Sequence, residues 1–408
     1  MKAVGKSPMA AFLPAGMVDI GVAMLCFFVL YDAVTGFERS LPLYHAGLAS
    51  QLLFFSVLAL LPHIVLGSPS LDFRVDGLAW GTLIIVLLVS TYAAESAEAT
   101  EKLRLIFSLF IFGLALRCWL RLASANVVPL AFLAVCLFHS AILILVFQNA
   151  PNANLSQPHD HSWVPYHSHI RHFAYHGMVA ACAGISLVFL ERRLRIVGFL
   201  LGTMALTGIF FFGARGALLG WLVFVVTYAL TSRRYRDVLL ASGLAVGIAM
   251  VLAYAFSALF THSPFTGGIH SRVESVESLV HTTGRIDIWL DAIKAAMQHP
   301  WFGYGLDGYR VSKCCLNGTV QPHSVLVQWL IEFGVIGACA VLGAFWWIIG
   351  TRLVRSFRQG GANPNLTALL SLIAGFFVFG LVDGLFYHAI PLLVFVILCA
   401  LLYQSIDP

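Results

Sequence analysis

Residues 195–231 have the sequence RIVGFLLGTMALTGIFFFGARGALLGWLVFVVTYALT, two apolar runs joined by a short connection that holds Arg215. Each run is close to the roughly 17 to 25 residues with which a helix crosses about 30 Å of hydrocarbon. The connection is too short for an ordinary solvated loop, so we expect the Arg215 guanidinium at the membrane boundary. The stretch predicts two membrane helices with a cation between them.

Similar apolar runs recur along the chain. Its 408 residues are 60% hydrophobic and 11% charged, with a mean hydropathy of +0.88, which leaves too few polar side chains to cover a water-soluble globule. No basic stripe indicates a nucleic-acid partner, and membrane lipids are the expected surroundings. We therefore expect an all-α, polytopic integral membrane protein with about twelve spans. They are residues 17–34, 47–66, 77–94, 103–120, 126–148, 174–190, 195–212, 216–231, 237–259, 325–349, 366–384 and 388–404.

Two connections are too long for tight turns and divide the chain into three parts. Residues 1–259 hold the first nine helices and a His-rich loop at 149–173, residues 260–322 form a large loop, and residues 323–408 hold the last three helices. Chemistry is expected near these loops, because the other connections are short.

Basic residues cluster at alternate short connections and predict the orientation. The clusters are Arg192, Arg193 and Arg195, then Arg233, Arg234 and Arg236, and then Arg352, Arg355 and Arg358. The positive-inside rule makes these connections cytoplasmic, so both long loops are expected outside, and topology alone accounts for the net charge of +5. Five polar residues are then expected together at the outer face: Arg171, Arg215, Arg285, His323 and Asp383.

Arg215 is flanked by Gly213 and Gly216, which would let a ligand approach the backbone closely. A guanidinium held at the boundary suits a phosphate or diphosphate through paired hydrogen bonds. The alternative is an arginine that snorkels to lipid phosphates.

The large loop contains an amphipathic helix over residues 284–297, with Ile286, Trp289, Leu290, Ile293 and Met297 at helical spacing. We expect it to lie on or over the membrane helices. A Pro- and Gly-punctuated turn with aromatic residues follows at 299–309. The aromatic side chains of this loop could bind a sugar or anchor the loop at the bilayer interface, and the sequence favours neither role. Trp289 is a candidate substrate-binding residue.

His323 is expected to begin the tenth span, where an imidazole suits a general base. Leu330, Gly334 and Gly337 would share its stripe on a continuous helix, so that a neighbouring helix packs closely there. A capping or structural histidine is the alternative. Asp383, between the last two spans, would orient His323 or pair with an arginine, because an unpaired carboxylate is costly there. Glu332 is interpreted as a packing or structural group on the side away from His323.

The His-rich loop could hold a metal ion, since His172 and His176 lie one helical turn apart. No cysteine or paired glutamate completes a recognisable set, so we expect no metal and no cofactor. Arg171 is the better candidate there, as a third cation for a diphosphate. Cys314 and Cys315 are either reduced thiols or a vicinal disulfide.

Three motifs resemble the O-antigen ligase superfamily, which also contains O-antigen polymerases and protein O-oligosaccharyltransferases. They are Gly213-Ala-Arg-Gly216, the Gly284-Arg285 helix with its Pro300-Trp-Phe-Gly-Tyr-Gly305 turn, and His323-Ser324 followed by nine residues, Gly334, two residues and Gly337. The resemblance is strongest over residues 195–345. Ala214 departs from the serine often found before the arginine, and the His-rich loop has no recognised counterpart.

The resemblance implies transfer of a polysaccharide from undecaprenyl diphosphate to a sugar hydroxyl of the lipid A-core, without a metal. The protein would be a multi-pass protein of the bacterial inner membrane with its site facing the periplasm. Arg215 and Arg285 would bind the diphosphate, and His323 would be the general base. The modest length and the histidine pattern favour a ligase over a polymerase or a protein oligosaccharyltransferase. A transporter is less well supported, because its charges would lie near the bilayer midplane in two related halves.

Overall fold

The computed structural model of the chain describes residues 15–35, 41–65, 77–94, 97–149, 170–259, 285–312 and 320–406. Within those ranges the chain forms helices and turns, and no strand. Nine helices of the described residues are long and apolar enough to cross a membrane, and three more apolar helices are shorter. The all-α polytopic membrane protein expected from the sequence is confirmed, while the number of spans stays a prediction.

The helices before residue 260 are α1 (Ala15–Thr35), α2 (Leu41–Val65), α3 (Gly77–Ala93), α4 (Ala97–Leu120), α5 (Val127–Asn149), α6 (Ile170–Leu190), η4 (Arg192–Leu194), α7 (Arg195–Phe211), α8 (Arg215–Ser232) and α9 (Tyr235–Leu259). Those after residue 284 are α12 (Arg285–Ala296), α13 (Gly308–Val311), α14 (Val325–Phe345), η5 (Trp346–Gly350), α15 (Thr351–Gln359), α16 (Pro364–Val382), η6 (Leu385–Tyr387) and α17 (Ala389–Ile406). Each expected span falls on one of these helices. Most of the His-rich loop, much of the large loop, and Cys314 and Cys315 lie outside the described residues.

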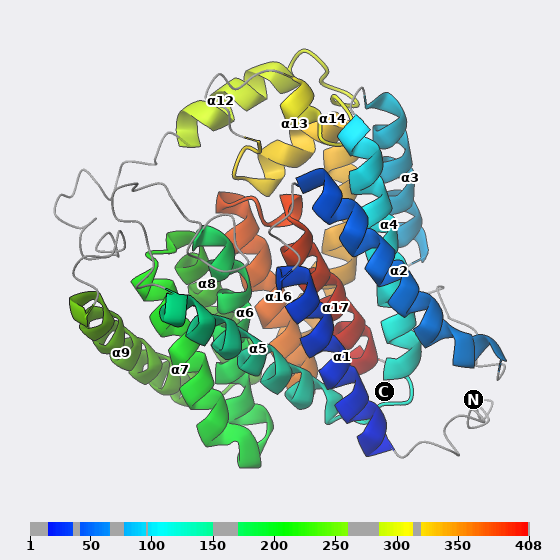
Figure 1. The fold of residues 1–408 in the computed structure, drawn as a ribbon. Coiled ribbons are helices and arrows are strands. Elements are labelled where there is room, and N and C mark those ends of the chain that lie inside the picture. Colours follow the sequence, from blue (N-terminus) through cyan, green and yellow to red (C-terminus); the bar gives the residue numbers. More distant parts are fainter. Residues whose placement is uncertain are drawn as a thin grey trace.

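The long helices form a bundle, and α12 and α13 lie together at one end of it (Figure 1). Helices α8 and α16 pack especially closely, because a Cβ atom on Gly220 would lie 2.7 Å from the carbonyl oxygen of Gly375. Gly216, at the start of α8, would likewise meet the Phe379 ring and lies beside Val382 at the end of α16. The close crossing therefore brings the start of α8 next to the residues that follow α16.

Basic residues from several connections meet at the other end of the helices. The guanidinium of Arg117 lies 4.6 Å from the centroid of the Tyr403 ring, and that of Arg352 lies 5.5 Å from the same centroid. Arg233 lies against Gly360 in the connection between α15 and α16. Arg233 and Arg352, from two of the basic clusters, thus occupy one end of the bundle, as the sequence predicts. Its cytoplasmic location stays a prediction.

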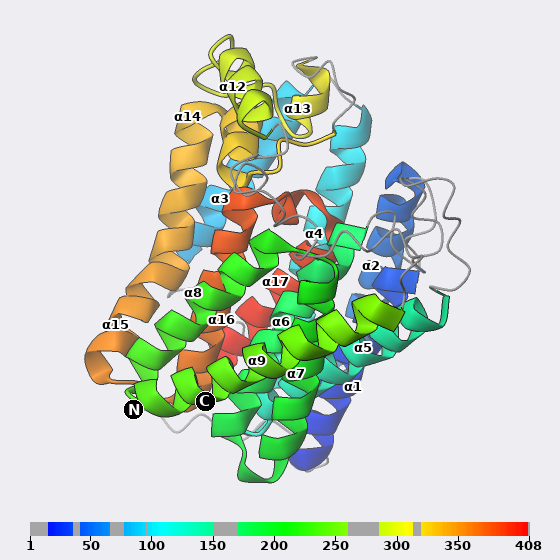
Figure 2. The ribbon, with the colours of Figure 1, turned by 90° about the vertical axis from the view of Figure 1, so that its left-hand side faces the viewer.

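The helix expected over residues 325–349 is interrupted. Gly334 has φ 65° and ψ −173°, so α14 consists of a first part before Gly334 and a second part after it. The second part runs along the side of the bundle into α15 (Figure 2). The expected helical stripe joining His323 to Gly334 and Gly337 is therefore wrong, because the helical repeat does not continue through Gly334.

The turn that follows α12 packs against α14 at the interruption and accepts hydrogen bonds from it. The backbone N–H groups of Val335 and Ile336 donate to the carbonyl oxygens of Pro300, at 2.8 Å, and Trp301, at 3.2 Å. A Cβ atom on Gly334 would overlap the backbone of Trp301, and the positive φ also favours glycine. Gly334 thus permits the close approach of the turn, which satisfies donors that a continuous helix would bond internally.

Candidate active site

Asp383 lies directly after α16 and makes polar contacts with residues from distant parts of the chain. Its side chain is buried, and Oδ1 accepts the N–H of Gly384 at 2.7 Å and the hydroxyl of Tyr175 at 3.2 Å. Tyr175 belongs to α6, so this hydrogen bond ties the end of α16 to the start of another helix. A buried carboxylate requires such partners, which makes Asp383 the centre of the site.

Arg285 is the first residue of α12, and its guanidinium reaches the same place. It donates to the carbonyl oxygen of Val382, and its Nη2 atom lies 3.8 Å from Oδ2 of Asp383. Ala292, Ala295 and Ala296 form the buried face of α12, which packs on α14. Small side chains thus let α12 lie close over the membrane helices, and its N-terminal end places Arg285 at Asp383.

His323 approaches Asp383 from another segment. Its Nδ1 atom lies 3.6 Å from Oδ1 of Asp383, and its side chain is 24% exposed. The residue has φ 53°, in the left-handed region that few residues other than glycine adopt. The backbone is held in this conformation just before α14 begins, so the imidazole is close to the carboxylate and still open to a ligand. Asp383 thus contacts both a histidine and an arginine, which the sequence offered as alternatives, and its role in the site stays a prediction.

These contacts control the charge of Asp383. Burial opposes ionisation, but the contact with His323, the positive charge of Arg285 and the Gly384 N–H together hold the pKa of the carboxyl below its usual range. Asp383 is therefore negatively charged, and its charge can orient both the Arg285 guanidinium and the His323 imidazole.

Trp289 supports His323 indirectly. Its indole N–H donates to the carbonyl oxygen of Pro322 at 2.8 Å. The other apolar residues expected on its face, Ile286, Leu290, Ile293 and Met297, are exposed. Trp289 thus holds Pro322, the residue before His323, close to α12. The role of Trp289 in substrate binding stays a prediction.

Arg215 begins α8 and its side chain is exposed. The neighbouring Gly216 lies against Val382, whose carbonyl oxygen accepts from Arg285. Arg215 is therefore at the same end of the bundle as Arg285 and Asp383. The expectation that Gly216 leaves room for a ligand differs from the structure, because α16 occupies that room. Gly213 has φ 64° and turns the chain between α7 and α8.

Arg171 lies in the first turn of α6, one helical turn before Tyr175. Since Tyr175 bonds to Asp383, the backbone of Arg171 is near the site. Its side chain lies outside the described residues, so its role stays a prediction.

Sequence reasoning missed three residues of this region. Gln321 Nε2 lies 3.3 Å from His388 Nε2, and the His388 ring lies 5.6 Å from the ring of Tyr175. A Cβ atom on Gly384 would overlap the Gln321 amide, so this glycine makes room for it. Tyr175, Gln321 and His388 all lie within a few residues of the ends of expected spans, and polar residues at such boundaries were the available signal.

His176, which the sequence places one helical turn from His172, has another partner. His176 is buried, and its Nδ1 atom lies 2.8 Å from Nδ1 of His139 on α5. One ring must donate and the other accept. The His172 side chain is outside the described residues. Among the side chains that the structure describes, no group of three or more His, Cys, Asp or Glu residues has the arrangement of a metal site.

A family model and a known protein are similar to parts of this chain. Residues 200–342, which include Arg215, Arg285 and His323, match the O-antigen ligase family model. The chain is also 33% identical over 103 residues to the O-antigen ligase of Pseudomonas aeruginosa. That match covers 25% of this chain and 23% of the relative, so it spans about a quarter of either protein. Both matches support a relationship between this chain and the O-antigen ligase superfamily.

Proposed function

We propose that this protein is an O-antigen ligase, which transfers a polysaccharide from undecaprenyl diphosphate to a sugar hydroxyl of the lipid A-core. One observation carries the proposal: Arg285 and His323, both within the matched region, meet at the Asp383 carboxylate. An anion-binding group and a candidate base on either side of one carboxylate suit a transfer with a charged leaving group.

Arg285 and Arg215 would bind the donor diphosphate. The bond between the anomeric carbon and the phosphate oxygen breaks, so negative charge grows on the leaving undecaprenyl diphosphate. Guanidinium groups at fixed positions stabilise that charge through paired hydrogen bonds, which removes the need for a metal ion. Val382 and Asp383 hold the Arg285 guanidinium in place. Arg171 is a third candidate cation on the same side of the bundle.

His323 would take the proton of the acceptor hydroxyl. We assign the imidazole proton to Nδ1, the nitrogen that faces Asp383, which leaves the Nε2 lone pair available as the base. The distance of 3.6 Å is longer than a hydrogen bond, but catalytic hydrogen bonds often tighten only when substrates bind. The hydroxyl oxygen attacks the anomeric carbon as the diphosphate leaves. A single displacement of this kind inverts the anomeric centre.

The site is expected to face the periplasm of a bacterial inner membrane. Helix α12, whose first residue is Arg285, lies at one end of the bundle, and the C-terminal end of the chain lies at the other (Figure 1). Tyr403, near that C-terminal end, contacts Arg117 and Arg352. Because basic connections favour the cytoplasmic side, the opposite end faces outward. A lipid-linked donor and a lipid A-core acceptor could both reach it from the outer leaflet.

The proposal is tested with purified protein and a lipid-linked glycan donor. One reaction contains rough lipopolysaccharide as acceptor, another contains only a second lipid-linked glycan, and both are repeated with EDTA. We expect glycosylated lipopolysaccharide at an unchanged rate in EDTA. Elongated lipid-linked glycan alone would instead identify a polymerase. Loss of transfer in EDTA, restored by one added metal, would contradict the metal-independent mechanism.

A further inference from the structure

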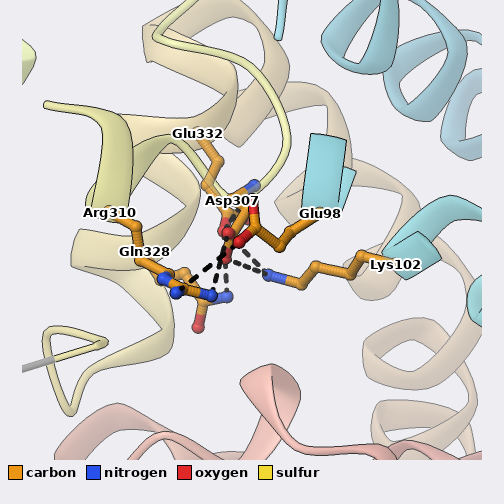
Figure 3. Close-up of polar contacts among 6 residues, drawn as sticks. All are labelled: Glu98, Lys102, Asp307, Arg310, Gln328 and Glu332. Atoms are coloured by element: carbon orange, nitrogen blue, oxygen red, sulfur yellow. Dashed lines mark hydrogen bonds and ion pairs between the residues drawn. The ribbon is translucent and has the colours of Figure 1, made fainter. Parts of the chain in front are cut away.

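A second group of charged and polar side chains joins α4, α13 and α14 (Figure 3). It comprises Glu98 and Lys102 of α4, Asp307 and Arg310 at α13, and Gln328 and Glu332 of α14. The side chains of Lys102, Asp307 and Glu332 are at most 5% exposed. Burial of three ionisable groups costs free energy, which indicates that they have a role in the protein.

Glu332 is the centre of this group. Its Oε1 atom accepts hydrogen bonds from Lys102 Nζ at 3.0 Å, from the Asp307 N–H at 3.2 Å and from Gln328 Nε2 at 3.3 Å. Lys102 Nζ also lies 3.9 Å from Oδ1 of Asp307. Lys102 therefore lies between two buried carboxylates from different segments, and Arg310 is the second cation, with its Nη1 atom 3.7 Å from Oδ2 of Asp307. Removal of Lys102 would take away the cation that binds Glu332.

The backbone around Glu332 holds the turn that follows α12. The Ile331 and Glu332 carbonyl oxygens accept the N–H groups of Tyr304, at 2.9 Å, and Gly305, at 3.0 Å. On its other side, the turn donates from Leu306 N–H to the Ser90 carbonyl oxygen of α3 at 3.1 Å. The turn is thus fixed between α3 and the first part of α14, at the position where Lys102 binds Glu332.

Two of the segments fixed here lead directly to residues of the candidate site. The first part of α14 follows His323, and the turn is continuous with α12, whose first residue is Arg285. Lys102 Nζ also lies 4.5 Å from the centroid of the Tyr387 ring, and Tyr387 follows Asp383 in the same connection. A shift of this charged group would therefore move the candidate base and the candidate diphosphate ligand relative to Asp383.

We infer that Lys102 and Glu332 are positioning residues, whose ion pair sets the place of Arg285 and His323 on either side of Asp383. The inference rests on the proposed function, because it is the transfer step that requires this alignment. Neither residue touches the candidate site directly. Their loss should therefore lower kcat more than it weakens donor binding, which depends on the arginines themselves.

The test separates this role from a contribution to stability alone. Lys102→Met and Glu332→Gln each remove one charge at similar size, and the double variant removes both. Each single variant leaves an unbalanced charge, whereas the double variant leaves the Asp307 carboxylate with Arg310, whose Nη1 atom lies 3.7 Å from Oδ2, so its thermal unfolding midpoint should recover. Lys102→Arg keeps the positive charge. The matched control is Glu101→Gln with Arg104→Met, which removes a more exposed ion pair from the same helix.

We expect each single variant to lower kcat by at least about tenfold with the donor KM within about threefold, and Lys102→Arg to retain most of the activity. The double variant should regain the melting temperature but keep the low kcat. Recovery of kcat together with the melting temperature would overturn the inference, as would wild-type kcat in the single variants. The control pair should behave as wild type.

Amide hydrogen exchange provides a measurement that does not depend on activity. Residues 323–333 should exchange faster in the double variant than in the wild type or the control pair. If the wild type transferred no glycan, the proposed function would fail while this comparison still tested the ion pair. Unchanged exchange in residues 323–333 would show that the ion pair does not fix the segment, and the inference would be wrong.

Discussion

Asp383 lies between His323 and Arg285, with its two carboxylate oxygens facing different partners. Oδ1 lies 3.6 Å from the imidazole Nδ1 atom, and Oδ2 lies 3.8 Å from the guanidinium. The proton-transfer and diphosphate-binding roles proposed for the two residues are therefore connected through one negative charge. A change in Asp383 should affect both roles.

Asp383→Asn keeps the size of the side chain and removes its charge. The amide no longer balances Arg285 or favours the His323 tautomer with its proton on Nδ1, so we expect kcat to fall about 10²-fold and the donor KM to rise. Steady-state transfer kinetics provide the measurement. Asp287→Asn, at an exposed position on α12, is the control and should be close to wild type. A kcat within threefold of wild type for Asp383→Asn would remove Asp383 from the mechanism.

Arg215→Lys and Arg215→Ala distinguish a diphosphate ligand from a snorkelling arginine. Lysine keeps the charge but not the paired donors, so it should raise the donor KM and retain partial activity, whereas alanine should be nearly inactive. Arg193→Ala, at an exposed position among the basic residues expected inside, provides the comparison. If Arg215→Ala bound and transferred the donor as the wild type does, the lipid-snorkelling alternative would be correct.

Gly334→Ala tests the interruption of α14. A left-handed backbone costs a residue with a Cβ atom about 1 to 2 kcal/mol, and here that atom would also overlap the Trp301 backbone. We expect destabilisation of at least about 2 kcal/mol, seen as a lower thermal unfolding midpoint in detergent. Gly343→Ala is the matched control on the second part of α14, because no atom lies within 4 Å of the added methyl group. Equal midpoints for the two variants would contradict the described interruption.

Asp307→Asn tests the buried charge near α13. Burial raises the pKa of Asp307 from 3.8 to about 6, although Lys102 opposes the shift. Because the folded-state pKa is the higher one, the stability that Asp307 contributes is present below pH 3.8 and lost as the pH rises through about 6. Asn, which tolerates the left-handed backbone of Asp307, should therefore raise stability above pH 6 by about 1 to 3 kcal/mol.

Thermal unfolding at pH 4.5 and pH 7.5 checks this prediction. The wild type should lose more stability between these pH values than Asp307→Asn does. Asp291→Asn, at an exposed position on α12, should follow the wild type. A variant that is less stable than the wild type at pH 7.5 would show that the ion pairs of Asp307 outweigh its burial.

The sequence predicts the helices well, because long apolar runs must satisfy their backbone groups internally in lipid. It also predicts that Arg285, His323 and Asp383 lie together, because the alternating basic connections assign all three to one face. The interruption at Gly334 could not be predicted in the same way. The apolar run continues on both sides of Gly334, and hydrophobicity does not distinguish a continuous helix from two parts held by a distant turn.

The sequence also did not predict the contacts that residues from other segments make in this region. Lys102 lies just before an expected span, and its pairing with Glu332 depends on how α4 and α14 pack. Tyr175 and His388 were visible as polar residues at helix ends, but their contacts depend on the position of Asp383. The residue types at the membrane boundary were thus predictable, whereas the pairing among them required the three-dimensional arrangement.

Replacement of His323 tests the central claim most directly, by measuring donor retention and transfer rate in the same purified protein. His323→Ala removes the imidazole, and His323→Asn is a second variant that tolerates the left-handed backbone. Both should retain lipid-linked donor, transfer it about 10² to 10⁴ times more slowly, and gain residual rate as pH rises and solvent replaces the base. Loss of donor binding with the fold intact would contradict the account, because His323 would then be a diphosphate ligand and not the base.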